Sequence, residues 1–169
     1  LKRLTLNPVE EDEFIDKDIN IRDYLHEIIS SFKEISKKEF VFNFDQDSNP
    51  KKISKSIEIV YGLRNFIGNA NKFAKNSIFI NLKSDSQFTE LTIEDDGNGY
   101  PRDIISKIGE PYLKSNYSKD KSKEGLGLGL FIGKTLLEKN FASVNCRNSK
   151  TRNGAEVVIR WKNKELFNI

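Results

Sequence analysis

The sequence predicts an α/β fold: a two-layer sandwich in which one mixed, mostly antiparallel sheet is covered by helices on one face. Three observations support this class. Some segments carry apolar residues at helical spacing, others alternate as strands do, and several predicted strands follow one another directly along the chain. Strands that are adjacent in sequence favour antiparallel pairing, because a short turn can join them.

The N-terminal half is predicted to begin with an amphipathic helix over residues 21–35, for which Asn20 is a candidate N-cap. Residues 40–44 (FVFNF) alternate as a strand does, and residues 49–52 (NPKK) are predicted to turn the chain. A long helix is expected over residues 54–74, because its apolar side chains form one stripe at the period of an α-helix.

Two strands are predicted next, SIFINLKS at residues 77–84 and FTELTIED at residues 88–95, joined by a short hairpin connection. A short helix around residues 104–108 and a polar stretch follow, and another helix ends at about Lys139. The last two predicted strands are ASVNCRNS and AEVVIRW.

The composition limits the possible function classes. The chain has 169 residues, 37% of them hydrophobic and 31% charged, which suits one domain with a buried core. Its formal net charge of +3 is too small to indicate a nucleic-acid partner. The sequence has no apolar run of about 18 residues, so we expect this segment to make no membrane contact.

A single cysteine, Cys146, excludes an internal disulfide framework and fits a reducing, cytoplasmic compartment. We expect it to be a small core or strand residue. The chain begins at Leu1 and has no methionine, from which we expect a piece of a longer protein.

The segment KSKEGLGLGLFIGKT, residues 121–135, alternates glycine and leucine before a predicted helix. Its GKT does not complete a phosphate-binding P-loop, because Leu128 stands where that motif needs glycine. A dinucleotide fingerprint also fails, since its third glycine would replace Leu130. What remains is a glycine-rich turn that opens a helix, which leaves backbone N–H groups free to bind an anion. A flexible hinge is the alternative.

Three polar residues of the predicted 54–74 helix, Asn65, Asn69 and Lys72, share one face opposite the apolar stripe. Gly62 and Gly68 flank this face, and we expect them to leave room for a ligand. A carboxamide oxygen is a suitable ligand for Mg²⁺, and a lysine one turn away would neutralise phosphate charge. A solvated helix face is the alternative.

The third candidate motif is the strand end TIEDDGNGYP. Gly97 and Gly99 would allow the backbone to approach a flat ligand, while Asp95 accepts a hydrogen bond from an exocyclic amine. Asp96 is expected to face solvent. An ordinary polar turn is the alternative for this motif alone, but the three motifs in this order form a far more specific set.

Together, RNFIGNANKFA, DDGNG, GEPYL, EGLGLGL and NGAEVVIRW resemble the sequence boxes of the catalytic ATP-binding domain of sensor histidine kinases. That domain belongs to an ATPase superfamily that includes gyrase B, the ninety-kilodalton heat-shock chaperone and MutL. The resemblance extends over about residues 20–162 and implies the Bergerat-type ATP-binding fold for a catalytic domain over residues 20–169. Residues 1–19 would be a linker, or the tail of a dimerisation and phosphoacceptor hairpin outside this sequence.

The resemblance also implies roles for individual residues. Asn69 would be the Mg²⁺ ligand and would act in catalysis together with Lys72 and Lys114, the latter near the terminal phosphate. The remaining residues would bind ATP: Asn65 and Phe73 near the phosphates and ribose, Asp95 at the adenine amine, Gly97 and Gly99 along the base, Gly125, Gly127, Leu128 and Gly129 at the phosphates, and Gly154 in the closing strand. The polar stretch before Gly125 would be a mobile ATP lid.

The spellings EPY, GLGLGLFIGKTLLEK and GAEVVIRW are most similar to the redox-responsive sensor kinases of the RegB type. Tyr112 stands where most of these domains have Phe, a departure that the RegB type shares. Such kinases carry a redox-active cysteine near their phosphoacceptor helices. Cys146 is not in that place, so no redox control is carried over to this chain.

His26 is the only histidine, and LHEII resembles the start of a phosphoacceptor box but lacks its proline. The 39 positions from His26 to Asn65 are also too few for the two-helix hairpin of the family. We therefore expect His26 to be a polar residue on the first helix of the domain.

The resemblance implies a protein histidine kinase module that binds Mg-ATP and donates the γ-phosphate to a histidine outside this chain. Its partners would be the dimerisation and phosphoacceptor helices of its own full-length protein and the receiver domain of a response regulator. The alternative is a nucleotide-gated ATPase or regulatory ATP-binding module of the same superfamily without a phosphoacceptor histidine. An HExxxP-like helix upstream of Leu1 would favour the kinase, and anchoring of the full-length protein in the inner membrane stays open.

Overall fold

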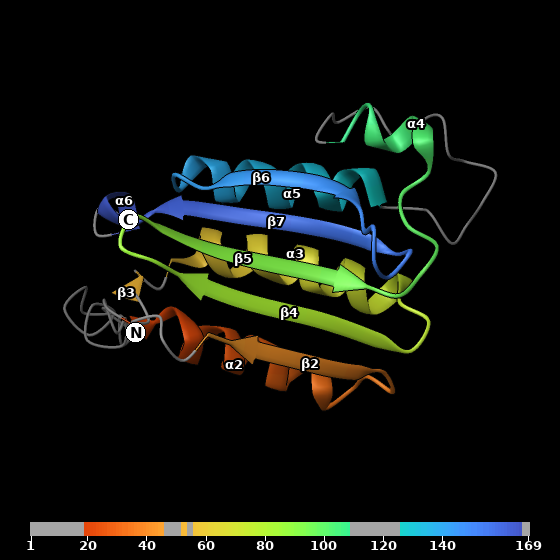
Figure 1. The fold of residues 1–169 in the computed structure, drawn as a ribbon, viewed down its shortest axis with the longest axis horizontal. Helices are drawn as coiled ribbons and strands as arrows, with labels where there is room; N and C mark the ends of the chain where they lie inside the picture. Colours follow the sequence, from red (N-terminus) through yellow and green to blue (C-terminus); the bar gives the residue numbers. More distant parts are fainter. Residues whose placement is uncertain (1–18, 46–51, 54–55, 109–125, 167–169) are drawn as a thin grey trace, which may run out of the picture.

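A five-stranded sheet with the order β2-β4-β5-β7-β6 forms one layer of the structure (Figure 1). The computed structural model describes residues 19–45, 52–53, 56–108 and 126–166. The strands of the sheet are β2 (Glu39–Phe44), β4 (Ser77–Ser84), β5 (Phe88–Asp95), β6 (Ser143–Asn148) and β7 (Ala155–Lys162). The β2–β4 pair is parallel, and the other three pairs are antiparallel.

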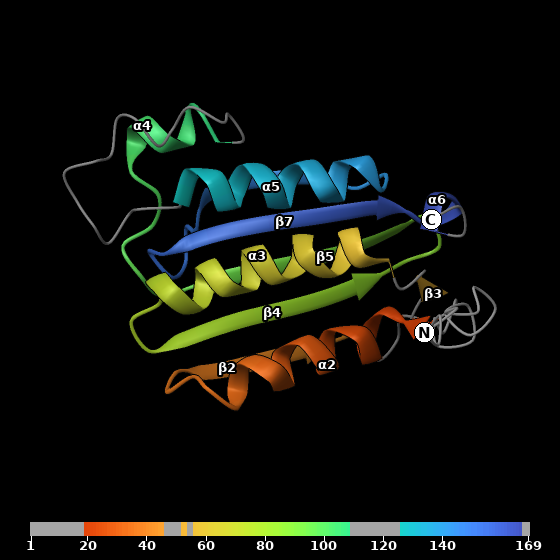
Figure 2. The ribbon, with the colours of Figure 1, turned by 180° about the vertical axis from the view of Figure 1, so that it is seen from behind.

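Helices form the second layer, and they cover one face of the sheet (Figure 2). They are α2 (Ile21–Lys33), α3 (Ile57–Phe73) and α5 (Leu126–Lys139). The middle helix, α3, contacts both of the others. The predicted fold class, a mixed and mostly antiparallel sheet with helices on one face, is therefore confirmed.

The first two helices begin at capping side chains. Asn20 Oδ1 accepts a hydrogen bond of 2.8 Å from the backbone N–H of Arg22, which confirms the predicted N-cap of α2. Ser56 Oγ accepts a bond of 3.1 Å from the N–H of Ile59, so α3 begins at Ile57 rather than at residue 54. A side chain that caps N–H groups of the first turn stabilises a helix by about 1 kcal/mol.

Four short elements differ from the prediction or were absent from it. Helix α4 (Arg102–Ile105) begins and ends earlier than expected, directly after Pro101, whose fixed φ suits a helix start. The small sheet of β1 (Ile19–Asn20) and β3 (Lys52–Ile53) and the terminal helix α6 (Asn163–Leu166) were not predicted. Elements of two to four residues are too short to show a hydrophobic period. Of the predicted turn at 49–52, residues 49–51 lie outside the described residues.

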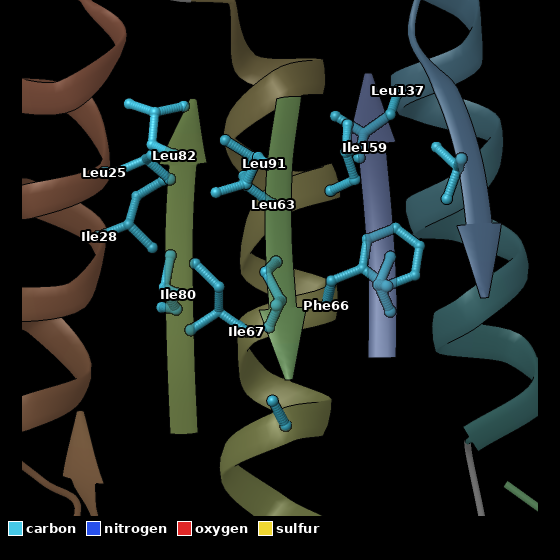
Figure 3. Close-up of a cluster of buried hydrophobic side chains, with 14 of the residues drawn as sticks. Leu25, Ile28, Leu63, Phe66, Ile67, Ile80, Leu82, Leu91, Leu137 and Ile159 are labelled. Atoms are coloured by element: carbon cyan, nitrogen blue, oxygen red, sulfur yellow. The ribbon is translucent and has the colours of Figure 1, made fainter. Parts of the chain in front are cut away.

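The core lies between the sheet and the helices (Figure 3). Its central side chains are at most 4% exposed: Leu25 and Ile28 of α2, Leu63, Phe66 and Ile67 of α3, Leu137 of α5, Ile80 and Leu82 of β4, Leu91 of β5, and Ile159 of β7. The apolar stripe predicted for α3 thus faces the sheet. In β4 the buried residues alternate with half-buried or exposed ones, as expected for a sheet covered on one face.

Helices α3 and α5 approach closely because glycines lie between them. A Cβ atom on Gly62 would lie 2.7 Å from Leu137 Cγ, and one on Gly133 would lie 2.9 Å from the Phe66 ring. Gly68 faces α2 instead, where a Cβ atom would lie 3.6 Å from Phe32. The expectation that Gly62 and Gly68 leave room for a ligand is therefore wrong, because both face neighbouring helices.

We expect Gly62→Val to lower the free energy of unfolding by about 1–3 kcal/mol, because the added methyl groups must displace the buried Leu137. Gly68→Ala is the matched control. Its methyl group reaches ordinary contact distance from Phe32, and alanine is favoured over glycine in a helix by about 1 kcal/mol. Urea unfolding measures both changes. Equal destabilisation by the two substitutions would contradict the close packing of α3 on α5.

Candidate functional site

The predicted polar face of α3 lies beside the first turn of α5. A Cβ atom on Gly129 would lie 3.5 Å from Asn69 Nδ2 and 3.7 Å from Asn65 Oδ1. The first backbone N–H groups of a helix have no partner within the helix, and they carry the positive end of its dipole. The fold therefore brings two carboxamides together with a helix end that suits an anion.

The two carboxamides are held in different ways. Asn65 Nδ2 donates a hydrogen bond of 2.7 Å to the carbonyl oxygen of Tyr61 in the same helix, so the position of its oxygen near Gly129 is fixed. Asn69 Nδ2 is buried and has no hydrogen-bond partner among the residues that the structure describes. A buried donor without a partner costs about 1–3 kcal/mol. Such unpaired groups mark sites where something other than folding selects the side chain.

The C-terminal end of α3 carries the next two candidates. Lys72 is exposed, and its Nζ lies 5.3 Å from the centre of the half-buried Phe73 ring. Lys38, which the sequence did not single out, reaches this helix end from the α2–β2 connection. Its Nζ donates to the carbonyl oxygens of Asn71 and Lys72, and it thereby caps α3 with a positive charge.

Asp95 ends β5 and is 3% exposed. Its Oδ1 accepts hydrogen bonds from the backbone N–H of Gly97 at 2.8 Å and of Ala155 at 3.3 Å. Burial raises the pKa of this carboxyl group, and the two N–H donors oppose the shift only in part. Because both bonds within the described chain go to Oδ1, the carboxylate is fixed in orientation and keeps acceptor capacity on Oδ2.

Gly97 and Gly154 let the chain close around Asp95, and Gly99 shapes the loop that follows it. A Cβ atom on Gly154 would lie 1.9 Å from the carbonyl oxygen of Asp95, and one on Gly97 would lie 2.2 Å from that of Phe73. Gly99 has a φ of +76°, which favours glycine. The end of β5 therefore touches the end of α3, and α3 runs from this contact to the asparagines beside α5.

Asp96 is partly exposed to solvent, as predicted, but it also has a structural role that was not predicted. Its half-buried carboxylate accepts backbone hydrogen bonds from Lys75 at 2.8 Å, Asn76 at 3.0 Å and Ser77 at 3.2 Å. Partial burial raises the pKa of Asp96, but these N–H donors together hold it below its usual value. Asp96 thus fixes the turn from α3 to β4, and no sequence motif marked this role.

The remaining predicted residues divide into described and undescribed ones. In the first turns of α5, Gly127 is buried, Gly129 is half-buried and Leu128 is 42% exposed. Lys114, Tyr112 and Gly125 lie outside the described residues, as do residues 1–18 of the expected linker.

Cys146 and His26 lie in regular elements, as expected. Cys146 is a half-buried residue of β6, and burial raises the pKa of its thiol to about 12. His26 is an exposed residue of α2, and its ring packs against the Phe42 ring in a T-shaped arrangement with the ring centres 4.7 Å apart. Helix α3 separates α2 from α5, so His26 does not lie with the asparagine site (Figure 2).

The chain belongs to the family described as histidine kinase-, DNA gyrase B- and HSP90-like ATPases, whose model matches residues 54–165. The sensor histidine kinase RegB of Cereibacter sphaeroides is 39% identical to it over 97 residues, which are 54% of this chain and 21% of RegB. The sensor protein RstB of Escherichia coli is 30% identical over 99 residues, which are 59% of this chain and 23% of RstB. The match thus spans about a fifth of the length of these relatives.

Solved structures agree with this assignment. The nucleotide-free catalytic domain of the histidine kinase ThkA superposes with a TM-score of 0.69 at 19% identity, over 86% of this chain and 95% of that domain. The solved chain of the mycobacterial sensor histidine kinase MprB gives a TM-score of 0.67 at 19% identity, over 86% of this chain and 95% of that chain. The described domain therefore has the fold of a histidine kinase catalytic domain. The predicted resemblance to RegB-type kinases is confirmed by the 39% identity to RegB. Within the described ranges, no helix is long and apolar enough to cross a bilayer.

The neighbouring carboxylates Asp95 and Asp96 should affect stability in opposite directions. A raised pKa in the folded state means that stability falls as pH rises from the ordinary aspartate pKa through the raised value. Asp95→Asn removes this penalty and should leave the protein at least as stable as the parent at neutral pH. The pKa of Asp96 is lowered, so its contribution is present above the ordinary pKa and is lost as pH falls through the lowered value. Asp96→Asn should therefore be destabilising at neutral pH.

Thermal unfolding of the parent and both variants is compared from acid to neutral pH, across the ordinary aspartate pKa of about 3.9. The advantage of Asp95→Asn should shrink toward acid pH, where the parent is protonated, and so should the deficit of Asp96→Asn. A large loss of stability in Asp95→Asn at neutral pH would mean that the ionised carboxylate supports the fold.

Proposed function

We propose that this chain is the catalytic ATP-binding module of a two-component sensor histidine kinase. The observation that supports the proposal most is that two candidate sites of different chemistry lie along the C-terminal half of α3. Asn65 and Asn69 lie beside Gly129 of α5, whereas Phe73, one turn further on, touches the loop that holds Asp95. Asn69 and Phe73 are four residues apart, about 6 Å along the helix axis. One site suits phosphates and a hard cation, and the other suits a base.

The buried carboxylate at the base site favours adenine. Asp95 is an acceptor whose Oδ1 is occupied by two backbone N–H groups, so Oδ2 can accept from an exocyclic amine. Adenine presents an amine at its sixth position. Guanine presents a carbonyl oxygen there, which would face the carboxylate without a proton between them. Gly97 and Gly154 place no side-chain atoms beside Asp95.

The phosphate site fits Mg²⁺ when the metal is bound together with the nucleotide. The described residues contain no cluster of three or more His, Cys, Asp or Glu side chains that could hold a metal. Mg²⁺ commonly takes few protein ligands and fills its other positions with phosphate oxygens and water. The Oδ1 atom of Asn69 would be the protein ligand, and its buried, unpaired Nδ2 is a donor that suits a phosphate oxygen. Asn65, Lys72 and the α5 residues Gly127, Leu128 and Gly129 would surround the phosphates, and the bound metal would neutralise phosphate charge.

Lys114 near the terminal phosphate and Gly125 at the phosphates remain proposals that rest on the resemblance to the family. The same holds for the linker role of residues 1–19.

The proposed reaction transfers the γ-phosphoryl group to a histidine outside this chain. The bond from the γ-phosphorus to its bridging oxygen breaks, and ADP leaves with the electron pair. A bond from phosphorus to an imidazole nitrogen forms, and the proton of that nitrogen passes to a base that this chain does not supply. The module acts by positioning the nucleotide and balancing its charge. The receiver domain of a response regulator would accept the phosphoryl group next.

The relatives support this reading over an ATPase or regulatory ATP-binding module without a phosphoacceptor. The matching family includes both kinds of protein, but RegB and ThkA are named histidine kinases. We therefore propose that dimerisation and phosphoacceptor helices of the full-length protein are partners of this module. Because ATP and receiver domains are cytoplasmic, we place the module in the cytoplasm, with any membrane anchor elsewhere in the full-length protein.

Calorimetry with ATP and Mg²⁺ tests the site. The parent chain should bind Mg-ATP, and Asn69→Asp should weaken binding by about tenfold or more, because it places a negative charge beside the phosphates. Asn71→Asp is the control: it adds the same charge to α3, where the side chain accepts a hydrogen bond from Ser36 instead. Equal affinities of the parent and Asn69→Asp would remove Asn69 from the phosphate site. No binding of ATP by the parent at any Mg²⁺ concentration would contradict the proposed function.

Transfer of labelled phosphate tests the kinase reading. With γ-labelled ATP and Mg²⁺, this chain alone should acquire no acid-labile phosphohistidine, whereas a separately produced acceptor hairpin of the same full-length protein should become labelled. His26→Gln should transfer as well as the parent, because His26 is a surface residue of α2, away from α5. Label on His26, or loss of transfer in a folded His26→Gln variant, would overturn this assignment.

A further inference from the structure

Asn148 joins the end of β6 to the glycine loop that follows Asp95. Its Oδ1 accepts a hydrogen bond of 2.7 Å from the backbone N–H of Tyr100, and its Nδ2 donates one of 3.0 Å to the backbone carbonyl of Tyr100. One carboxamide thereby satisfies both polar groups of a residue that belongs to no helix or strand. The geometry of these bonds is the one that a neighbouring strand would provide.

The loop is shaped to this side chain. A Cβ atom on Gly99 would lie 2.7 Å from Asn148 Oδ1, so only glycine permits the carboxamide to approach. Gly99 also has the positive φ of +76° that brings the N–H of Tyr100 to the bond. Gly99, which was predicted to lie along a base, is therefore also required by the packing of the loop against Asn148.

Cys146, two residues earlier in β6, holds the same loop through a second contact. It lies on the same face of β6 as Asn148, and its thiol interacts with the hydroxyl group of Tyr100. The Tyr100 side chain is 7% exposed, and burial raises the pKa of its hydroxyl group well above the usual value. Tyr100 is thus anchored through its hydroxyl group to Cys146 and through its backbone to Asn148.

We propose that Asn148 is a positioning residue for the base-binding end of the site, a role that rests on the proposed function. It holds the loop from Gly97 to Tyr100 against β6. At the other end of that loop, the N–H of Gly97 bonds to Asp95 Oδ1 and so sets the direction of the carboxylate. Asn148 itself need not touch the nucleotide, and it lies in none of the sequence boxes that carry the resemblance to the kinases.

The reason for this device is entropy. The loop Gly97–Tyr100 contains two glycines in four residues, and glycine loses more backbone freedom on ordering than any other residue. We call the two hydrogen bonds between Asn148 and Tyr100 the clamp. Without the clamp, ATP would have to order the loop on binding, and the entropy cost would lower the affinity for ATP. With the clamp, the cost is met when the domain folds.

Three variants test the proposal. Asn148→Ala removes both bonds, and Asn148→Asp keeps the acceptor for the Tyr100 N–H but cannot donate to its carbonyl. Asn145→Ala is the matched control, because Asn145 is an exposed residue of the same strand on its opposite face. Affinity for Mg-ATP is measured by calorimetry below the unfolding temperature of every variant. Hydrogen exchange of the Tyr100 amide is measured without nucleotide.

We expect Asn148→Ala to weaken ATP binding by about five- to tenfold, Asn148→Asp to lie between it and the parent, and Asn145→Ala to match the parent. The Tyr100 amide should exchange faster in Asn148→Ala and remain protected in Asn148→Asp. Asn148→Asp keeps the protection only if the hydrogen bond from the Tyr100 N–H to the side chain of residue 148 causes it.

Two outcomes would overturn the inference. Faster Tyr100 exchange in Asn148→Ala with unchanged ATP affinity would show a clamp without a role in binding, and would leave the proposed function intact. Unchanged Tyr100 exchange would show that Asn148 does not hold the loop. A parent chain that binds no ATP would overturn the proposed function itself, and this inference with it.

Discussion

The close approach of α3 to its neighbours is the constraint on which the rest of the structure depends. Along the middle of α3, Gly62 leaves space for Leu137 of α5, and Phe66 packs over Gly133. At the C-terminal end, the carbonyl oxygen of Phe73 lies where a side chain of Gly97 would otherwise be. One helix is thereby fixed against α5 and against the β5 loop at once. Because interiors are close-packed, a shift of α3 at either contact would move Asn65 and Asn69 relative to Asp95.

The two adjacent carboxylates at the end of β5, Asp95 and Asp96, have different electrostatic environments. Asp96 accepts several backbone N–H groups around the α3–β4 turn and stays ionised easily, so it supports the fold. Asp95 is buried, its pKa is raised, and its ionised form is costly to the folded state. A residue that lowers stability while it lies in a glycine-lined site is better explained by binding than by folding. The positive charge of Lys38 on the end of α3 lowers this cost in part.

Much of this architecture follows from the sequence, because the long elements carry strong periodic patterns. The strands 77–84 and 88–95 were predicted with their observed bounds, since their apolar alternation is bounded by polar turns. The sequence boxes also pointed to residues that the fold brings together, as Asn65, Asn69 and Gly129 show. What could not be predicted are contacts between distant segments. Gly62 looks the same in the sequence whether it faces a ligand or Leu137, and nothing local tells that Asp96 or Asn148 bonds to another element's backbone.

These unpredicted contacts share one physical pattern. Lys38 binds carbonyl oxygens at the end of α3, Asp96 binds N–H groups of the next turn, and Asn148 binds both backbone groups of Tyr100. Each satisfies backbone groups at the end of an element or in a connection with a side chain from elsewhere in the chain, where the helix or sheet ladder leaves them without a partner. The surroundings of Asp95 are therefore held by side chains that bond to backbone groups outside the regular ladders. Asp95, the last residue of β5, is held in a fixed direction by backbone N–H groups, while Gly97 and Gly154 let neighbouring backbone pack directly against the strand end.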